Sequence, residues 1–150
     1  MSPVPKPFVD SLVIRTTPRI RVAGLREYID DVTRLVLRGR GFSCLLTDDG
    51  EIRRLNRQFR KKDSATDVLS FPAAVATEVS GDIAVSVDRA RAQAAEHGHS
   101  LAEELRILIL HGALHLRGMD HETDAGQMAR AEARWRKRFE LPLSLLERIQ

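Results

Sequence analysis

One stretch of the sequence restricts the fold more than any other. Residues 101–116, LAEELRILILHGALHL, are apolar on nearly every side of a helix and carry two histidines four positions apart. A helix that is hydrophobic all round is buried. Ser100 and Glu103 form the Ser-x-x-Glu pattern of a capping box, which marks the start of the helix. Gly118 allows the chain to turn after it. The sequence therefore predicts a buried helix over 101–116.

The rest of the chain mixes strand-like and helix-like segments. The patterns predict strands over 8–16, 42–47, 67–71 and 82–87, helices over 22–38, 51–59, 87–96 and 124–139, and a last helical turn over 143–149. This order is typical of an α/β (α+β) domain whose mixed sheet has about four strands packed with about five helices. A length of 150 residues suits one hydrophobic core. We therefore expect a flexible N-terminal tail over 1–7, which holds three prolines, and a single domain over 8–150.

Composition excludes several classes of protein. The sequence has no run of about 20 apolar residues, so a membrane span is excluded. The N-terminus lacks a charged region followed by an apolar one, so we expect no secretory signal. Cys44 is the single cysteine, so there is no disulfide partner, and we expect a cytoplasmic protein. The 24 basic residues comprise 20 Arg and 4 Lys, a bias that fits either a nucleic-acid partner or a GC-rich genome.

The strongest chemical signal is HGALHLRGMDH over 111–121. On a helix, His111 and His115 project from one face. The turn at Gly118 allows His121 to fold back towards them. Three neutral imidazoles that converge form a zinc-type site whose fourth position stays open for water. Burying imidazoles costs free energy unless each nitrogen has a partner, and a metal supplies one. The spacing therefore predicts one zinc ion bound by His111, His115 and His121.

The same spacing matches the peptidase pattern H-E-x-x-H-x-x-G-x-x-H, with one departure. Gly112 stands where the peptidases have the glutamate that acts as general base. Glycine cannot accept a proton, which argues against a peptidase. Asp120, beside His121, can either orient a ligand imidazole as an acceptor or serve as a turn residue. His97 and His99, before the long helix, are interpreted as solvated.

A second signal is the segment over 52–62, IRRLNRQFRKK, which holds six basic residues and no acid. Its first three arginines fit a solvated helix face, whereas Arg60, Lys61 and Lys62 fall after the predicted helix, in a loop that can approach a ligand. A merely solvated basic surface explains the segment equally well. The candidate contacts to RNA phosphates are Arg57, Arg60, Lys61 and Lys62.

Three motifs taken together resemble a known family. LNRQFRKKDSATDVLSFP, SGDIAVS and HGALHLRGMDHE are similar, in this order, to the YbeY family of bacterial metal-dependent endoribonucleases, or rRNA maturation factors. The resemblance spans roughly Leu45 to Glu132. It implies a single mixed α/β domain, one zinc ion, a cytoplasmic location and a role in ribosome biogenesis. His111, His115 and His121 match the family's metal ligands, and Arg60 matches its functional arginine.

The resemblance also implies a substrate and a setting. The substrate is single-stranded RNA near the 3′ end of small-subunit rRNA, ribosome quality control is a further role, and the ribosome or its assembly proteins are partners. Zinc can lower the pKa of water to about 7, so no carboxylate base is needed. We expect His115 and Arg60 to be catalytic, with Arg60 stabilising charge on the phosphate. The missing base leaves one alternative open: a ribosome-assembly or RNA-binding factor with a structural metal and little nuclease activity.

Overall fold

A four-stranded mixed sheet organises the fold. The computed structural model describes residues 11–74 and 79–149. The strands are β1 (Leu12–Ile14), β2 (Gly41–Thr47), β3 (Val68–Pro72) and β4 (Val79–Ser86), and they lie side by side in the order β1-β2-β4-β3. β1, β2 and β4 run parallel, while β3 pairs antiparallel with β4 at one edge. The predicted mixed sheet is confirmed.

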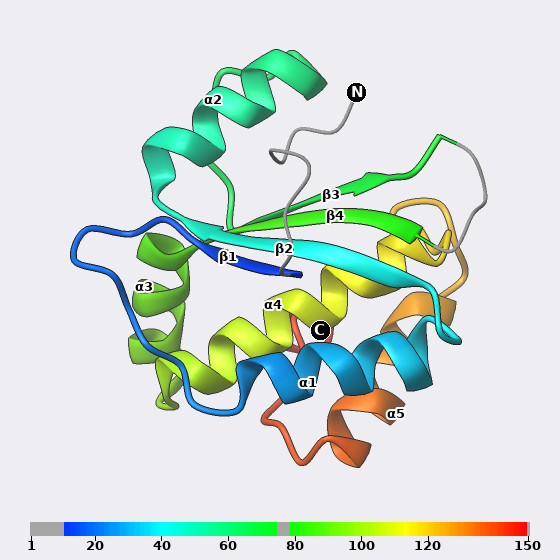
Figure 1. The fold of residues 1–150 in the computed structure, drawn as a ribbon. Helices are drawn as coiled ribbons and strands as arrows, with labels where there is room; N and C mark the ends of the chain where they lie inside the picture. Colours follow the sequence, from blue (N-terminus) through cyan, green and yellow to red (C-terminus); the bar gives the residue numbers. More distant parts are fainter. Residues whose placement is uncertain (1–10, 75–78, 150) are drawn as a thin grey trace.

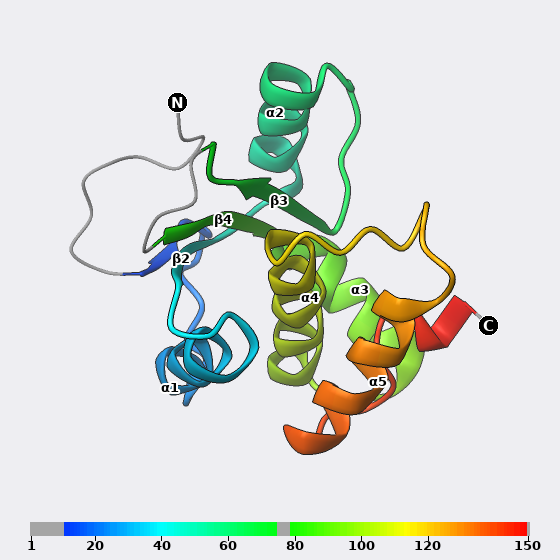
Figure 2. The same ribbon diagram turned by 90° about the vertical axis from the view of Figure 1, so that its right-hand side faces the viewer.

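Helices cover both faces of this sheet. They are α1 (Leu25–Asp31), α2 (Asp49–Arg60), α3 (Val87–His97), α4 (Leu101–Leu116) and α5 (Gln127–Arg138). α2 lies on one side of the sheet, and α4 runs along the other side between α1 and α5 (Figures 1 and 2). The predicted class, a single α/β domain with five helices, is thus confirmed. No helix in the described part of the chain is long and apolar enough to cross a membrane.

Apolar side chains form a core on each side of the sheet. The larger cluster surrounds α4, whose residues from Ile107 to Leu110 are at most 1% exposed. The smaller cluster lies under α2 and contains Leu45, Ile52, Leu55, Leu69 and Ala84. The capping box of Ser100 and Glu103 is present at the start of α4. The predicted bounds and burial of this helix are therefore confirmed.

Two predicted elements differ from those observed. The helix predicted over 22–38 begins at Leu25, after Gly24 with a φ of 73°, and its second half is a π-helix over Val32–Val36. The strand predicted over 82–87 begins earlier, at Val79, because Gly81 lies inside it rather than in a turn. A Cβ on Gly81 would lie 2.3 Å from the carbonyl oxygen of Phe71, so only glycine fits there. The interpretation of Ser80-Gly81 as a turn was wrong.

Side-chain caps move other boundaries. α2 begins at Asp49, before the predicted 51, because the Asp48 carboxylate accepts the Glu51 N–H at 2.8 Å. α5 begins at Gln127 rather than 124, since the Asp124 carboxylate accepts the N–H groups of Gly126 and Met128. The last predicted turn is a 3-10 helix over Glu147–Ile149. The tail over 1–7 and the start of the strand predicted over 8–16 lie outside the described residues.

Candidate metal centre

The end of α4 brings three imidazoles together. His111 and His115 lie one turn apart, with ring centroids separated by 4.7 Å. After α4 the chain turns at Gly118, whose φ is 97°, and the Met119 N–H donates to the carbonyl of Leu114 at 3.1 Å. This turn places His121 so that its ring centroid lies 5.3 Å from that of each of the other two histidines. The local sequence therefore builds the whole triad.

In His111 and His115, a hydrogen bond at Nδ1 leaves Nε2 free to bind a metal. Nδ1 of His111 lies 2.5 Å from Oε2 of Glu132, and Nδ1 of His115 lies 2.9 Å from the carbonyl oxygen of Met119. A carboxylate and a carbonyl accept hydrogen bonds, so each Nδ1 is the donor, and in a neutral imidazole Nε2 then carries the lone pair. Burial, and then the neighbouring His111, lower the pKa of His115 below its ordinary value. Both effects favour the neutral form that binds metal.

The free nitrogens fit a zinc-type ion. The Nε2 atoms of His111 and His115 are 3.2 Å apart, and two lone pairs at this distance repel each other unless a cation lies between them. Nitrogens 2.0–2.1 Å from a tetrahedral zinc ion are about 3.3 Å apart. One ligand atom from each histidine lies within 4.8 Å of the others. Nδ1 of His121 is buried and has no hydrogen-bond partner among the described residues. The triad can therefore hold a metal ion.

The triad faces a cleft of about 740 Å³. Besides the triad, the cleft is lined by β3, through Val68, Leu69, Ser70 and Pro72, and by three further segments: the end of α2 with the loop after it, the loop after α4, and the C-terminal turn. Figure 2 shows these three segments on the same side of the molecule. The end of α2 and the loop after it contribute Arg60 and Lys62. The other charged residues of the cleft are carboxylates, from Asp67, Asp120 and Glu122. The cleft is therefore mixed in charge rather than uniformly basic.

Contacts through Ser70 connect Arg60 to the backbone of α4 beside the triad. It is the last residue of α2, so the prediction that it lies in a loop was wrong. Its guanidinium donates to the carbonyl of Ser70 and lies over the ring of Phe71, 5.3 Å from the centroid. The hydroxyl of Ser70 donates in turn to the carbonyl of Gly112 at 3.0 Å, next to His111. These contacts connect α2, β3 and α4.

Gly112 packs closely against the sheet. A Cβ at this position would lie 3.0 Å from Oγ of Ser70 and 3.1 Å from two side-chain atoms of Ile83. The position where zinc peptidases carry their glutamate therefore lies against the sheet, with no room for a carboxylate. The structure thus supports the sequence argument against a peptidase.

Comparisons with known proteins agree with this geometry. The family model of endoribonuclease YbeY matches residues 19–140. This chain belongs to the YbeY family. An endoribonuclease YbeY from Solibacter usitatus is 48% identical over 145 residues, covering 96% of this chain and 97% of that protein. Another endoribonuclease YbeY, from Koribacter versatilis, is 61% identical over 104 residues, covering 69% of this chain and 68% of that protein. A solution structure from Thermotoga maritima is similar to this chain, with a sequence identity of 28% and a TM-score of 0.55. The match covers 83% of this chain and 85% of that one.

The cleft of this YbeY protein contains only some of the basic residues predicted to contact RNA. Arg60 and Lys62 line it, whereas Arg57 and Lys61 are not among its lining residues. Nη1 of Arg57 lies 3.7 Å from the carboxylate of Asp63, and Lys61 is the left-handed residue that ends α2. Any contact of these two residues with RNA would therefore lie outside the cleft.

The residue that supports a triad imidazole is Glu132, which the sequence analysis missed. The carboxylate of Asp120 accepts the Glu122 N–H at 3.1 Å and the Thr123 hydroxyl at 3.3 Å, so Asp120 shapes the turn. Glu132 comes from α5, is 1% exposed and contacts His111. The signal available in the sequence is its place on the stripe of α5 that also carries Met128, four positions earlier and fully buried.

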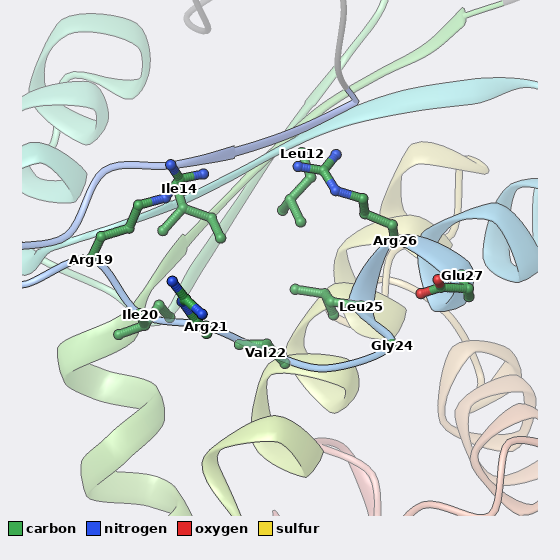
Figure 3. A pocket seen from close by; sticks show the side chains of 10 residues that line it. All are labelled: Leu12, Ile14, Arg19, Ile20, Arg21, Val22, Gly24, Leu25, Arg26 and Glu27. Carbon is green, nitrogen blue, oxygen red and sulfur yellow. The ribbon is translucent and has the colours of Figure 1, made fainter.

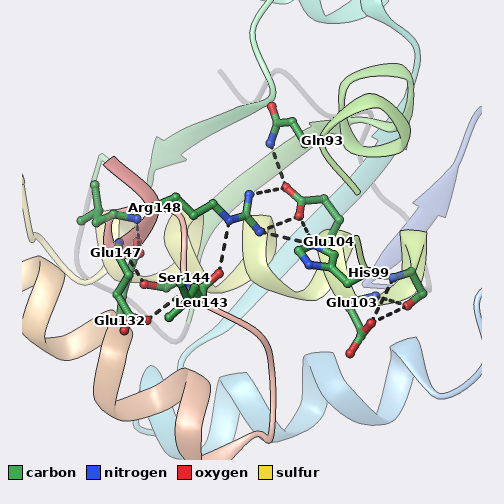
Figure 4. A network of polar contacts seen from close by, with 11 residues as sticks. Gln93, His99, Glu103, Glu104, Glu132, Leu143, Ser144, Glu147 and Arg148 are labelled. Carbon is green, nitrogen blue, oxygen red and sulfur yellow. Dashed lines mark hydrogen bonds and ion pairs between the residues drawn. The ribbon is translucent and has the colours of Figure 1, made fainter. Parts of the chain in front are cut away.

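The interpretation of His99 as solvated was wrong. Its side chain is 8% exposed, and its Nε2 lies 2.6 Å from Oε1 of Glu104, which is fully buried in α4. Glu104 also accepts hydrogen bonds from Gln93 and from Arg148 of the C-terminal turn (Figure 4). His97 is exposed, as predicted.

A second hollow of about 510 Å³ lies between β1 and the segment leading into α1 (Figure 3). Three arginines, Arg19, Arg21 and Arg26, line it together with apolar side chains that include Leu12 and Ile14. It contains neither a histidine nor any residue of the triad cleft. The candidate reaction site of this YbeY protein is therefore the cleft over the triad.

Proposed function

We propose that this YbeY chain is a zinc-dependent endoribonuclease that cuts single-stranded RNA at the His111–His115–His121 centre. The observation that carries the proposal is that the triad shares its cleft with Arg60 and Lys62. Cations of this kind bind phosphates without reading the base sequence. The relatives from Solibacter usitatus and Koribacter versatilis are both named endoribonuclease YbeY, which supports the same reaction class.

The chain's own residues prepare the centre for a metal. Three imidazoles are a donor set that suits zinc and leaves a position open. When bound, such an ion lowers the pKa of a coordinated water towards about 7 and polarises a phosphoryl oxygen. Glu132 and the carbonyl of Met119 hold the rings of His111 and His115 so that their Nε2 lone pairs stay directed to the ion. Gly112 contributes no base, and this chemistry does not require one.

Arg60 is the group placed to stabilise the phosphate. The hydrogen bond to Ser70 uses one of the five N–H donors of its guanidinium, and the contact with Phe71 fixes its plane. The remaining N–H groups can donate to phosphoryl oxygens as negative charge develops on them. A cation that is already in position needs no reorganisation during the reaction, which is why such groups stabilise transition states strongly.

The physiological substrate we propose is rRNA. The three motifs that resemble the YbeY family support a role at the 3′ end of small-subunit rRNA and in ribosome quality control. Partners would then be the ribosome or its assembly proteins, and the protein would act in the cytoplasm, where ribosomes are made. The alternative of an assembly factor with a structural metal predicts RNA binding without cleavage.

The test is single-turnover cleavage of an end-labelled single-stranded RNA, beside the same RNA annealed to its complement. The wild-type protein with zinc should cut the single strand in preference. His115→Ala should lose metal and cleavage together. Arg60→Ala should keep metal and fold but cut roughly 10–1000-fold more slowly. Arg54→Ala is the matched control, because Arg54 is an exposed residue of α2 that pairs with Glu51.

The outcomes separate the nuclease from the assembly factor. Equal cleavage by wild type and both site variants would point to a contaminating nuclease and refute the proposal. Tight RNA binding by metal-loaded protein without cleavage would favour the assembly factor. The fraction of zinc per chain, measured by elemental analysis, shows whether each variant was compared in the loaded state.

A further inference from the structure

The C-terminal turn provides an aliphatic wall of the triad cleft. Leu145, Leu146 and Ile149 line the cleft together with the three histidines. Ile149 is 76% exposed, compared with 51% for Leu143. A single exposed isoleucine is ordinary on a protein surface. Ile149 differs because it lies at the candidate reaction site and because hydrogen bonds and an ion pair fix its segment.

Buried charged groups hold this segment in place. Arg148, the neighbour of Ile149, donates to both oxygens of Glu104 at 2.6 and 2.9 Å (Figure 4). The side chains of Arg148 and Glu104 are 6% and 0% exposed. The Leu146 N–H donates at 2.9 Å to Oε1 of Glu132, whose other oxygen contacts the triad. Terminal segments often fray, and these bonds instead fix the aliphatic wall relative to the metal centre.

Two other walls of the cleft carry charged residues, whereas β3 contributes the uncharged Val68, Leu69, Ser70 and Pro72. Arg60, Lys62 and one carboxylate, Asp67, lie on the α2 side, and two carboxylates, Asp120 and Glu122, belong to the loop after α4. Figure 2 shows that loop between the α2 side and the C-terminal turn. A phosphate is attracted to the cations and repelled by the carboxylates. Since the α2 side carries two cations and one carboxylate and the loop after α4 carries two carboxylates, an RNA backbone in the cleft is placed on the α2 side. The aliphatic residues of the C-terminal turn are left for another part of the nucleotide.

RNA offers one large group that suits an aliphatic wall, namely the flat face of an unpaired base. In a duplex each base is stacked between its neighbours, whereas bases of single strands can be splayed out onto a protein surface. We propose that Ile149, together with Leu145, forms a subsite for the base of a nucleotide that flanks the scissile phosphate. This inference rests on the proposed function, since it places the RNA backbone beside Arg60. It gives a physical reason for cutting single strands.

The test compares Ile149→Ala with Leu143→Ala in the full chain. Both residues are exposed aliphatics of the same segment, but Leu143 does not line the cleft. The probes are a fluorescein-labelled single-stranded RNA with one mapped cleavage position and a series in which successive nucleotides lack the base. Fluorescence anisotropy in EDTA gives the dissociation constants, and cleavage with zinc gives kcat and KM. Thermal unfolding checks that both variants are folded.

Ile149→Ala should weaken binding of the intact RNA roughly fivefold, because it removes most of an aliphatic contact. It should raise KM by a similar factor with little change in kcat, and Ile149→Leu should restore both. RNA that lacks the base beside the cleavage position should bind wild type and Ile149→Ala equally, since the contact is already absent. Leu143→Ala should resemble wild type throughout.

No loss of affinity in Ile149→Ala, or an equal loss for every RNA of the series, would overturn the base subsite. A wild-type protein that binds with this base dependence but does not cut would refute the proposed nuclease and support the subsite. The two failures are therefore distinguishable.

Discussion

Glu132 determines which nitrogen of His111 is free to bind a metal, and Glu132→Gln tests this role. In the structure Oε1 accepts the Leu146 N–H at 2.9 Å, and Oε2 accepts the Nδ1 hydrogen of His111 at 2.5 Å. A carboxylate can accept at both oxygens, whereas an amide accepts at one end and donates at the other. Glutamine has the same shape but cannot satisfy both partners while the Nε2 of His111 stays free for metal.

The size of the effect follows from this conflict. Without metal, the amide oxygen of the substituted side chain faces Leu146 and its NH₂ group faces Nδ1 of His111, which moves the imidazole hydrogen to Nε2. Binding a metal at Nε2 then forces the amide to flip and leaves the buried Leu146 N–H without an acceptor. An unsatisfied buried donor costs about 1–3 kcal/mol. Since about 1.4 kcal/mol is tenfold in affinity, zinc should bind roughly 10–100-fold more weakly.

The assay is a zinc titration in competition with a chelating dye at neutral pH. Glu122→Gln is the matched control, because it removes the same charge from an exposed carboxylate of the same cleft that has no hydrogen bond to the triad. The metal-free variants should have similar thermal midpoints, since glutamine satisfies both neighbours in that state. Equal zinc affinity of Glu132→Gln and the control would refute the role of Glu132 in fixing the His111 tautomer.

Three further predictions concern stability, each measured by urea unfolding of the metal-free protein. Gly112→Glu, which restores the peptidase residue, should cost about 3 kcal/mol or more, because it overpacks the helix–sheet contact and buries a carboxylate; wild-type stability would contradict the packing argument. Arg148→Met should cost about 3 kcal/mol by leaving buried Glu104 without its cation; a loss below 1 kcal/mol would show that the remaining contacts suffice. The hydrogen bond from Arg136 lowers the pKa of Glu147 from 4.5 to about 2. The stabilisation that ionised Glu147 contributes is therefore fully present above pH 4.5 and disappears as the pH falls towards 2. Between pH 4.5 and 2, Glu147→Gln should therefore lose less stability than the wild-type protein.

Local signals predicted α4 and the triad. Ser100, Glu103 and Gly118 mark both ends of the helix within a few residues of it, and the capping hydrogen bonds form as the pattern indicates. The three histidines converge because helix periodicity and one glycine turn determine their directions. Such features depend on near neighbours in the chain, so the sequence alone was sufficient to anticipate them.

Features that depend on distant partners were not predictable in the same way. Glu132 supports His111 from 21 positions away, and His99 is buried because Arg148, 49 positions along, completes its network. The end of α2 was placed one residue early, which put Arg60 in a loop. Gly81 was interpreted as a turn residue because its place under Phe71 depends on the pairing of β3 with β4. In each case tertiary packing overrode the local pattern.

The compactness of the triad in the sequence affects how metal binding couples to folding. All three histidines lie within 11 residues, so the denatured chain retains H-x3-H-x5-H as a weak chelating segment. A ligand stabilises a fold only by the difference between its affinities for the folded and unfolded chains. Zinc should therefore raise the unfolding temperature by less than its affinity for the native protein suggests. The stabilisation of the fold by zinc then comes from groups that raise the zinc affinity of the native protein alone, above all Glu132.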